Sequence, residues 1–156
     1  METTKINKTD GISVKLSKEK SEEYLHSAFC NGIQELSHYG LQFDYEDSDY
    51  EKAKKSLEWK IENGIIPIGM TVYGKEKPTI CREDVWMEIL RVGGKLKVID
   101  TENDGEYTRS ITLSDVHNRV QKTPFNHLND MINESDDAVT ADVIIQTVFF
   151  EDIIFG

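Results

Sequence analysis

The sequence predicts a single α+β domain with a small, largely antiparallel sheet and about five or six helices. Its length of 156 residues is the usual size of one domain. Segments with helical and with strand periodicity follow one another without a regular βαβ order, and no internal repeat or low-complexity linker divides the chain. The first ten residues are polar and are expected to form a flexible N-terminal segment, so the domain is expected to span residues 11–156.

The N-terminal region is predicted to contain a strand and a long helix. Apolar and polar residues alternate over positions 12–16, as in a half-buried strand. Ser17 is placed to cap the helix that follows. Apolar residues then recur at helical spacing as far as Tyr39, and Gly40 supplies the stop.

The next region is predicted to contain two strands with a helix between them. Residues 41–45 alternate in the manner of a short strand. The pattern at residues 48–51 is a capping box, which predicts a helix with a lysine-rich exposed face that ends at Asn63-Gly64. Alternating apolar residues from 66 to 72 predict the second strand, whose proline favours a strand start or a sheet edge.

The C-terminal half is predicted to contain a helix, a β-hairpin and two shorter helices. Acidic residues open the helix over residues 83–92 and an arginine closes it, in keeping with the helix dipole. Two alternating segments flank the turn residues 102–105 and predict the hairpin. Helix starts are predicted at Ser114 and at Thr123-Pro124.

The last segment, residues 142–156, is apolar nearly all round. A buried helix is the favoured interpretation, and a strand is the alternative because many of its residues are β-branched. Ile153, Ile154 and Phe155 are interpreted as part of the core. The alternative is that they form a docking surface for a protein partner or for a second subunit.

Negative charge dominates the chain, with a formal net charge of -11. After Lys122 there is no lysine or arginine, so the basic face that neutralises phosphates is not visible and direct binding of nucleic acid is not expected. A basic protein partner or a cation stays open. An acidic patch is a candidate partner-binding site, and its carboxylates could also imitate the phosphates of DNA and occupy a basic site on another protein. It consists of Asp44, Glu46, Asp47 and Asp49.

The turn of the predicted hairpin is a candidate metal site. Asp100, Glu102 and Asp104 alternate and are followed by a glycine, like the start of a calcium-binding EF-hand loop. The twelfth position of such a loop is Ile111 here instead of a bidentate glutamate, and strands flank the loop where an EF-hand has helices. A solvated hairpin turn is therefore the favoured interpretation.

A second candidate metal site, or an acid–base pair, combines His117, His127 and Asp130. The two histidines lie in neighbouring predicted helices, and Asp130 follows His127 by about one turn. No HExxH or HxxxH pattern supports the site, so surface histidines on acidic helices are the commoner explanation.

No motif indicates a cofactor or a catalytic nucleophile. The GxSxG, GxGxxG and P-loop patterns are absent, and no cofactor is expected. Cys30 and Cys81 lie far apart in the sequence and are expected to be reduced and mostly buried. No membrane-spanning run or secretory signal is found, so a cytoplasmic location is expected.

These observations favour a small acidic, non-enzymatic protein-interaction module: an adaptor, an inhibitor or an assembly component of the kind that phages and mobile elements encode. It would bind a protein partner or form a homo-oligomer. Two alternatives stay open, a small metal-binding protein or enzyme that uses His and Asp side chains, and a DNA mimic that inhibits a basic nucleic-acid-binding protein.

Overall fold

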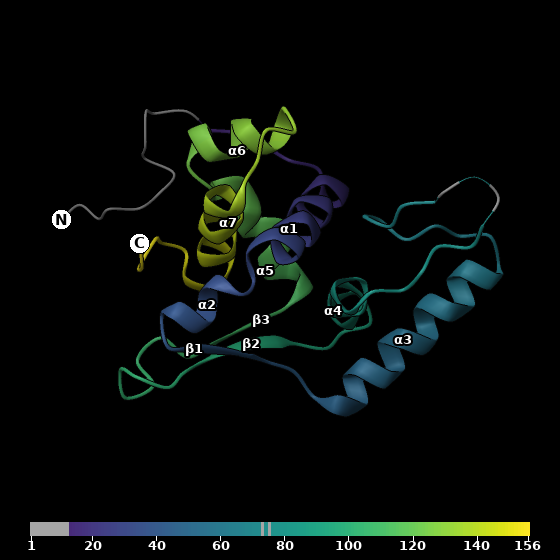
Figure 1. The fold of residues 1–156 in the computed structure, drawn as a ribbon, viewed down its shortest axis with the longest axis horizontal. Coiled ribbons are helices and arrows are strands. Elements are labelled where there is room, and N and C mark those ends of the chain that lie inside the picture. Colours follow the sequence, from purple (N-terminus) through teal and green to yellow (C-terminus); the bar gives the residue numbers. More distant parts are fainter. Residues whose placement is uncertain (1–12, 73, 75) are drawn as a thin grey trace.

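A computed structural model describes residues 13–72, 74 and 76–156, and within them the chain forms one compact α+β domain (Figure 1). The sheet is antiparallel with the strand order β1-β2-β3, so β2 is central. The strands are β1 (Leu41–Asp44), β2 (Leu96–Asp100) and β3 (Arg109–Ile111). The helices are α1 (Lys18–Gly32), α2 (Glu35–His38), α3 (Asp47–Glu62), α4 (Arg82–Arg91), α5 (Leu113–Arg119), the 3₁₀ turn η2 (Val120–Lys122), α6 (Phe125–Ile132) and α7 (Ala138–Phe150). The fold class predicted from the sequence is confirmed.

The hairpin of β2 and β3 is confirmed, and its alternating pattern explains which face is buried. Leu96 pairs with Ile111, and both side chains are fully buried. Leu96 and Val98 face the interior on alternate positions of β2, whereas Lys97 between them is only half-buried. β1 pairs with the other edge of β2, with Leu41 opposite Asp100.

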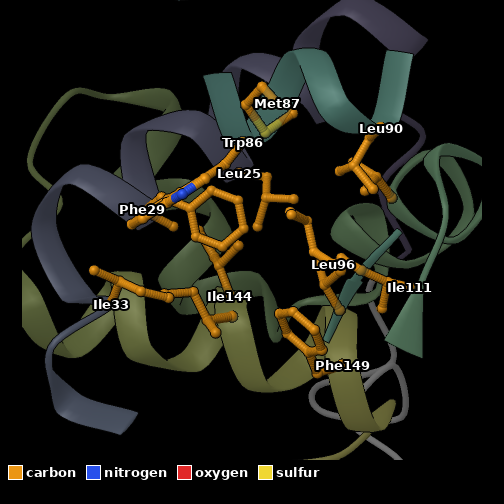
Figure 2. Close-up of a cluster of buried hydrophobic side chains, with 14 of the residues drawn as sticks. Leu25, Phe29, Ile33, Trp86, Met87, Leu90, Leu96, Ile111, Ile144 and Phe149 are labelled. Atoms are coloured by element: carbon orange, nitrogen blue, oxygen red, sulfur yellow. The ribbon is translucent and has the colours of Figure 1, made fainter. Parts of the chain in front are cut away.

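One hydrophobic core joins the helices to the sheet (Figure 2). Leu25 and Phe29 from α1 meet Trp86 and Leu90 from α4 and Ile144 from α7, all of them buried. Burying each side chain of this size is worth about 1.5–3 kcal/mol relative to leaving it exposed. The apolar stripes of three helices therefore close on a single interior, which makes the chain one unit.

The predicted long helix up to Tyr39 is wrong in extent. Ser17 caps α1 as expected, with its hydroxyl oxygen accepting the Lys20 N–H at 3.1 Å. However, α1 ends at Gly32 and a separate turn of helix, α2, follows before Gly40 adopts its positive φ of 75°. The last residue of α1 is also where this helix crosses α7: a Cβ on Gly32 would lie 2.7 Å from Ala141 Cβ.

The two strands predicted at residues 12–16 and 66–72 are wrong where the structure describes them. Residues 13–16 form no strand, although Val14 and Leu16 are half-buried and pack against the core. The Leu16 N–H donates to Gln121 Oε1 at 3.1 Å, so a side chain takes the place of a neighbouring strand. Around Gly69 the chain turns instead, because the Met70 N–H bonds to the Pro67 carbonyl oxygen and Gly69 has a φ of 89°.

The C-terminal segment contains the buried helix that its composition favours. α7 runs to Phe150 and ends where Glu151 adopts a left-handed conformation with φ of 59°. The caps predicted at Ser48 and Ser114 are wrong by two residues, since Glu46 precedes α3 and Thr112 caps α5 in a capping box with Asp115. None of the described helices has both the length and the apolar character needed to cross a membrane. The N-terminal segment that was expected to be flexible, residues 1–10, lies outside the described residues.

Candidate functional site

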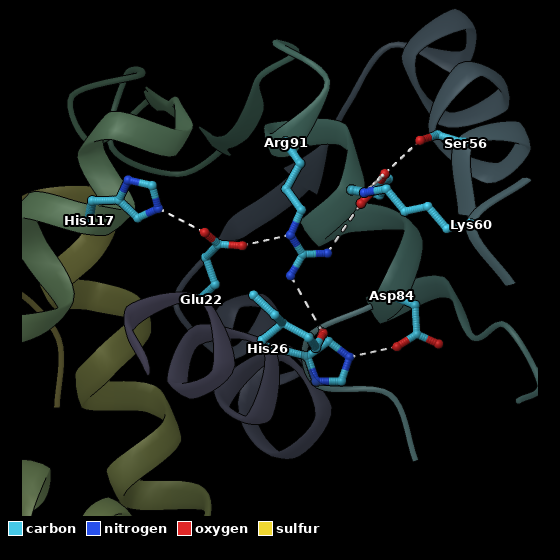
Figure 3. A network of polar contacts seen from close by, with 9 residues as sticks. Glu22, His26, Ser56, Lys60, Asp84, Arg91 and His117 are labelled. Atoms are coloured by element: carbon cyan, nitrogen blue, oxygen red, sulfur yellow. Dashed lines mark hydrogen bonds and ion pairs between the residues drawn. The ribbon is translucent and has the colours of Figure 1, made fainter. Parts of the chain in front are cut away.

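A polar network links α1, α4 and α5 near the edge of the core (Figure 3). Glu22 on α1 is buried and receives two partners. Arg91 Nε donates to Glu22 Oε1 at 2.6 Å, and His117 Nε2 lies 2.9 Å from Glu22 Oε2. Arg91 also donates through Nη1 to Glu88 at 3.2 Å. The guanidinium group of Arg91 is therefore clamped between two carboxylates from different helices.

Glu88 extends the network to α3 and is fully buried. Lys60 Nζ and Ser56 Oγ each lie 2.6 Å from Glu88 Oε2. Burial acts to raise the pKa of the Glu88 carboxyl, but the hydrogen bonds from Lys60, Ser56 and Arg91 outweigh it and lower the pKa below 4.5. Glu88 thus stays ionised in the folded chain. Its partners fix α3 against α4, a specificity role that suits buried ion pairs.

A second buried pair, His26 and Asp84, lies beside the network. His26 Nε2 is 2.7 Å from Asp84 Oδ1, while Asp84 Oδ2 accepts the backbone N–H of Cys81 at 2.7 Å. Asp84 therefore orients the imidazole ring and caps α4 at the same time. The backbone of Gly69 covers the ring, because a Cβ there would lie 2.8 Å from His26 Nδ1. Only glycine fits this position.

The His26–Asp84 pair lines a cavity of about 350 Å³, here named the His26 pocket, which is bordered by residues 69–71, residues 76–79 and the start of α4. Cys30 and Cys81 line the same pocket and both are exposed, so the expectation of buried cysteines is wrong. Burial and the acids Glu83 and Asp84 raise the pKa of the Cys30 thiol to about 11. Burial likewise raises the pKa of Cys81. Both thiols are held in the protonated form, which disfavours thiolate chemistry.

The predicted calcium loop is organised around one carboxylate. Asp100 is buried and accepts the backbone N–H groups of Glu102, Asn103 and Tyr107 at 2.9–3.0 Å. Burial alone would raise its pKa, but these hydrogen bonds lower it. The side chains of Glu102 and Asp104 are exposed and do not converge with it on a cation site. Asp100 acts as the anchor of the hairpin turn.

The candidate site of His117, His127 and Asp130 is not assembled. His117 pairs with Glu22 on α1, whereas His127 and Asp130 lie on α6. His127 Nδ1 is buried and has no hydrogen-bond partner among the described residues. Within the described part of the chain, no group of three His, Cys, Asp or Glu side chains is arranged to hold a metal ion.

The acidic patch lies at the start of α3. Glu46 is the residue before the helix, and Asp47 and Asp49 stand in its first turn, where carboxylates interact favourably with the helix dipole. Asp49 also lies over Gly94, since a Cβ on Gly94 would be 3.0 Å from Asp49 Oδ2. Asp44 is the last residue of β1 and is half-buried. Whether a partner binds this patch stays a prediction.

The residues after α7 fold back onto the domain. Gln146 Oε1 accepts the backbone N–H groups of Ile154 and Phe155, each at 2.8 Å. The ring of Phe155 stacks on Tyr39 with a centroid distance of 4.8 Å. Ile153 and Ile154 are 38% and 37% exposed, so they border the core without entering it. Whether a partner covers them stays a prediction.

The sequence interpretation missed an exposed apolar surface at the end of α3, here named the Trp59 surface and formed by Trp59, Ile65 and Ile66. Trp59 is 61% exposed, and Ile65 and Ile66 are 45% and 48% exposed. Trp59 stands about 200° around the helix from buried Leu57, off the apolar stripe. That off-stripe position is the signal in the sequence that could have revealed the surface.

A rigid turn holds the Trp59 surface in shape. The Ile65 N–H donates to the Lys60 carbonyl at 2.8 Å, and the Gly64 N–H donates to the Ile61 carbonyl at 3.1 Å. With Gly64 at a φ of 77°, this is a Schellman motif. The hydrogen bond to Lys60 brings Ile65 back to the last turn of α3, which also carries Trp59. The backbone that carries the exposed side chains is therefore ordered by its own hydrogen bonds.

Comparisons with known proteins give no family for the chain: no family model, no curated protein and no solved structure matches it. Its function is therefore inferred from its own residues. The two features that carry such an inference are the His26 pocket, where a His–Asp pair faces two thiols, and the Trp59 surface, where large apolar side chains face solvent.

Proposed function

We propose that this chain is a small acidic, non-enzymatic protein-interaction module, an adaptor, inhibitor or assembly component, and that the Trp59 surface is its contact surface. The observation that carries the proposal is the 61% exposure of Trp59 beside Ile65 and Ile66. Tryptophan is enriched among the residues that dominate binding energy at protein interfaces. A cluster of large apolar side chains facing water marks an interaction site.

The rigidity of the surface supports the same proposal. The Schellman turn fixes the backbone from Lys60 to Ile65, and Lys60 is itself held by Glu88. Because this backbone is already ordered, this chain loses little backbone conformational entropy when a partner binds. The surface is thus suited to recognition without rearrangement.

The test is a purified complex. A partner protein captured with the wild-type chain from its native host is purified, and its Kd is measured for wild type and for Trp59→Ser. Loss of an interface tryptophan costs about 2 kcal/mol or more, so the Kd is expected to weaken about 30-fold. Val72→Ser is the control, because Val72 is also an exposed apolar side chain, at 39%, and belongs to neither α3 nor α7. An unchanged Kd for Trp59→Ser would contradict the proposal.

The His26 pocket supports a second candidate function, a small enzyme or ligand-binding protein that uses His and Asp side chains. The observation in its favour is the 2.7 Å contact between His26 and Asp84 at the wall of the cavity. An imidazole oriented by a carboxylate can accept and donate protons.

This second candidate is tested by ligand binding. A panel of small metabolites and divalent cations is screened for a shift in the Tm of the wild-type chain, and any hit is repeated with His26→Gln. A shift that the variant abolishes supports the pocket, and the absence of any shift contradicts it. Elemental analysis of the purified chain also tests the candidate metal ligands Asp100, Glu102 and Asp104, and His117, His127 and Asp130.

A further inference from the structure

A second exposed apolar surface lies where α6 turns into α7, here named the α6–α7 corner and comprising residues 130–139. Val139 is 61% exposed and Ile132 is 42% exposed. The corner contains no lysine or arginine, and it carries four acidic residues, which are Asp130, Glu134, Asp136 and Asp137. Trp59 and Val139 are thus equally exposed, and each is the most exposed apolar residue of its own surface.

Lysines outnumber acids beside the Trp59 surface. The α3 stretch from Lys52 to Glu62 holds four lysines and two glutamates, Glu58 and Glu62. Lys60 is engaged by Glu88, but Lys52, Lys54 and Lys55 are exposed and make no ion pair with a described residue. Lys52 and Lys55 precede Trp59 by seven and four positions, so they share its helix face. An apolar centre with lysines beside it matches an apolar centre with carboxylates beside it.

The two surfaces cannot satisfy each other within one chain. α3 lies at one end of the molecule, while α1 and α4 separate it from α6 and α7 (Figure 1). Both surfaces stand on helices that are packed against the same core. Their complementarity can therefore be used only between two chains.

We infer that the Trp59 surface of one copy binds the α6–α7 corner of a second copy, head to tail. This inference rests on the proposed function and names its partner. The contact is heterologous, so the assembly keeps one free Trp59 surface at one end and one free α6–α7 corner at the other. Assembly therefore continues as a chain or closes as a ring. A contact built on one tryptophan and a few isoleucines and valines is small, which places it among weak, concentration-dependent associations.

Complementation between two disabled variants tests the inference. Trp59→Ser removes one surface and keeps the corner, whereas Val139→Arg disables the corner and keeps the Trp59 surface. Sedimentation equilibrium from about 10 µM to about 1 mM should show wild type growing beyond a dimer and each variant remaining a monomer. An equimolar mixture of the two variants should form a 1:1 dimer and nothing larger, and added salt should weaken it.

Two controls accompany these measurements. Circular dichroism should show both variants folded, since both positions are solvent-exposed. Val72→Ser, which changes an exposed valine outside both surfaces, should assemble like wild type. A wild type that stays monomeric, or a mixture that forms no dimer, overturns the inference. If wild type is monomeric while Trp59→Ser loses binding to a different protein, the proposed function stands and only self-association fails.

Discussion

Glu88 is a fully buried carboxylate whose partners come from two helices. Lys60 and Ser56 reach it from α3 and Arg91 from its own helix. Replacing one member of such a network leaves the other charges without compensation in a poorly solvated place. A substitution in this network should therefore lower the free energy of unfolding by more than a substitution in an exposed ion pair.

Glu88→Gln is expected to lower the free energy of unfolding at pH 7 by about 3 kcal/mol, because Lys60 loses its buried counter-charge and Arg91 loses one of its two. Urea denaturation followed by circular dichroism measures the change. Glu23→Gln is the matched control: Glu23 forms an exposed pair with Lys20 at 3.3 Å, and its loss should cost less than about 0.5 kcal/mol. Equal costs for the two variants would contradict the role of Glu88.

The same variant has a defined pH dependence. The pKa of Glu88 is lower in the folded chain than its ordinary value of 4.5, so the folded state binds the proton less readily than the unfolded state. The stabilisation by Glu88 is fully present above pH 4.5 and is lost as the pH falls through the folded pKa. The stability difference between wild type and Glu88→Gln should therefore shrink below pH 4.5, and a difference that grows there would contradict this assignment.

Local chemistry explains which residue roles were predictable. Ser17 is predictable as a cap because its hydroxyl oxygen accepts a backbone N–H from the first turn of the helix, three residues later in the sequence. The His26–Asp84 pair joins residues 58 positions apart, and its geometry depends on how α1 packs against α4. No local pattern encodes such a pair. For the same reason the sequence does not show that Cys30 and Cys81 share a pocket.

Among the elements, the crossing of α1 and α7 depends on the smallest side chains. Gly32 and Ala141 face each other, and the backbone of α7 at Asp142 also lies close to Gly32. The crossing brings together the two helices that carry much of the core. Added volume at this point must push the helices apart, because protein interiors are close-packed.

Gly32→Ala is expected to destabilise the chain although alanine favours helices. The gain in helix propensity is about 1 kcal/mol, but a Cβ only 2.7 Å from Ala141 Cβ forces a shift that costs about 1–3 kcal/mol. Chemical denaturation gives the net change. Gly32→Ala/Ala141→Gly should be more stable than the sum of the single variants predicts, because the second change makes room for the first. If Gly32→Ala stabilised the chain, the two helices would have room for a Cβ at this crossing.

Element predictions succeeded where periodicity and caps agreed. The helix predicted at residues 83–92 is α4, and the predicted hairpin is formed by β2 and β3. The segments at 12–16 and 66–72 have the alternation of strands. In the first, Val14 and Leu16 are half-buried as the pattern suggests, whereas in the second Ile66 and Val72 are exposed. Leu16 satisfies its N–H through Gln121, and the chain turns at Gly69, so neither segment finds a neighbouring strand.

At the scale of the molecule, burial is uneven. Ala53 and Leu57 are the buried side chains of α3, whereas α7 is buried along nearly its whole length. α3 is joined to the body mainly through α4 and the Glu88 network. Helices with few buried side chains open at lower free energy than the global unfolding transition.

Hydrogen–deuterium exchange should therefore rank the helices. Amides of α1 and α7 are expected to exchange only through global unfolding, and amides of α3 through a smaller opening at lower free energy. Mass spectrometry of proteolytic fragments measures both rates at one pH. Glu88→Gln should speed exchange in α3 more than in α7. Equal protection of α3 and α7 in the wild type would show that α3 unfolds only with the whole domain.

The chain has two tryptophans, and the fold has put them in opposite surroundings: Trp86 is enclosed by Phe29 and Phe43, while Trp59 stands in water. Their fluorescence is thereby separable without any label. Acrylamide should quench the red-shifted emission of Trp59 and leave Trp86 nearly untouched. A partner that binds at the end of α3 would shield this one indole from water and shift its emission to the blue. The intrinsic fluorescence of Trp59 therefore reports binding at this surface.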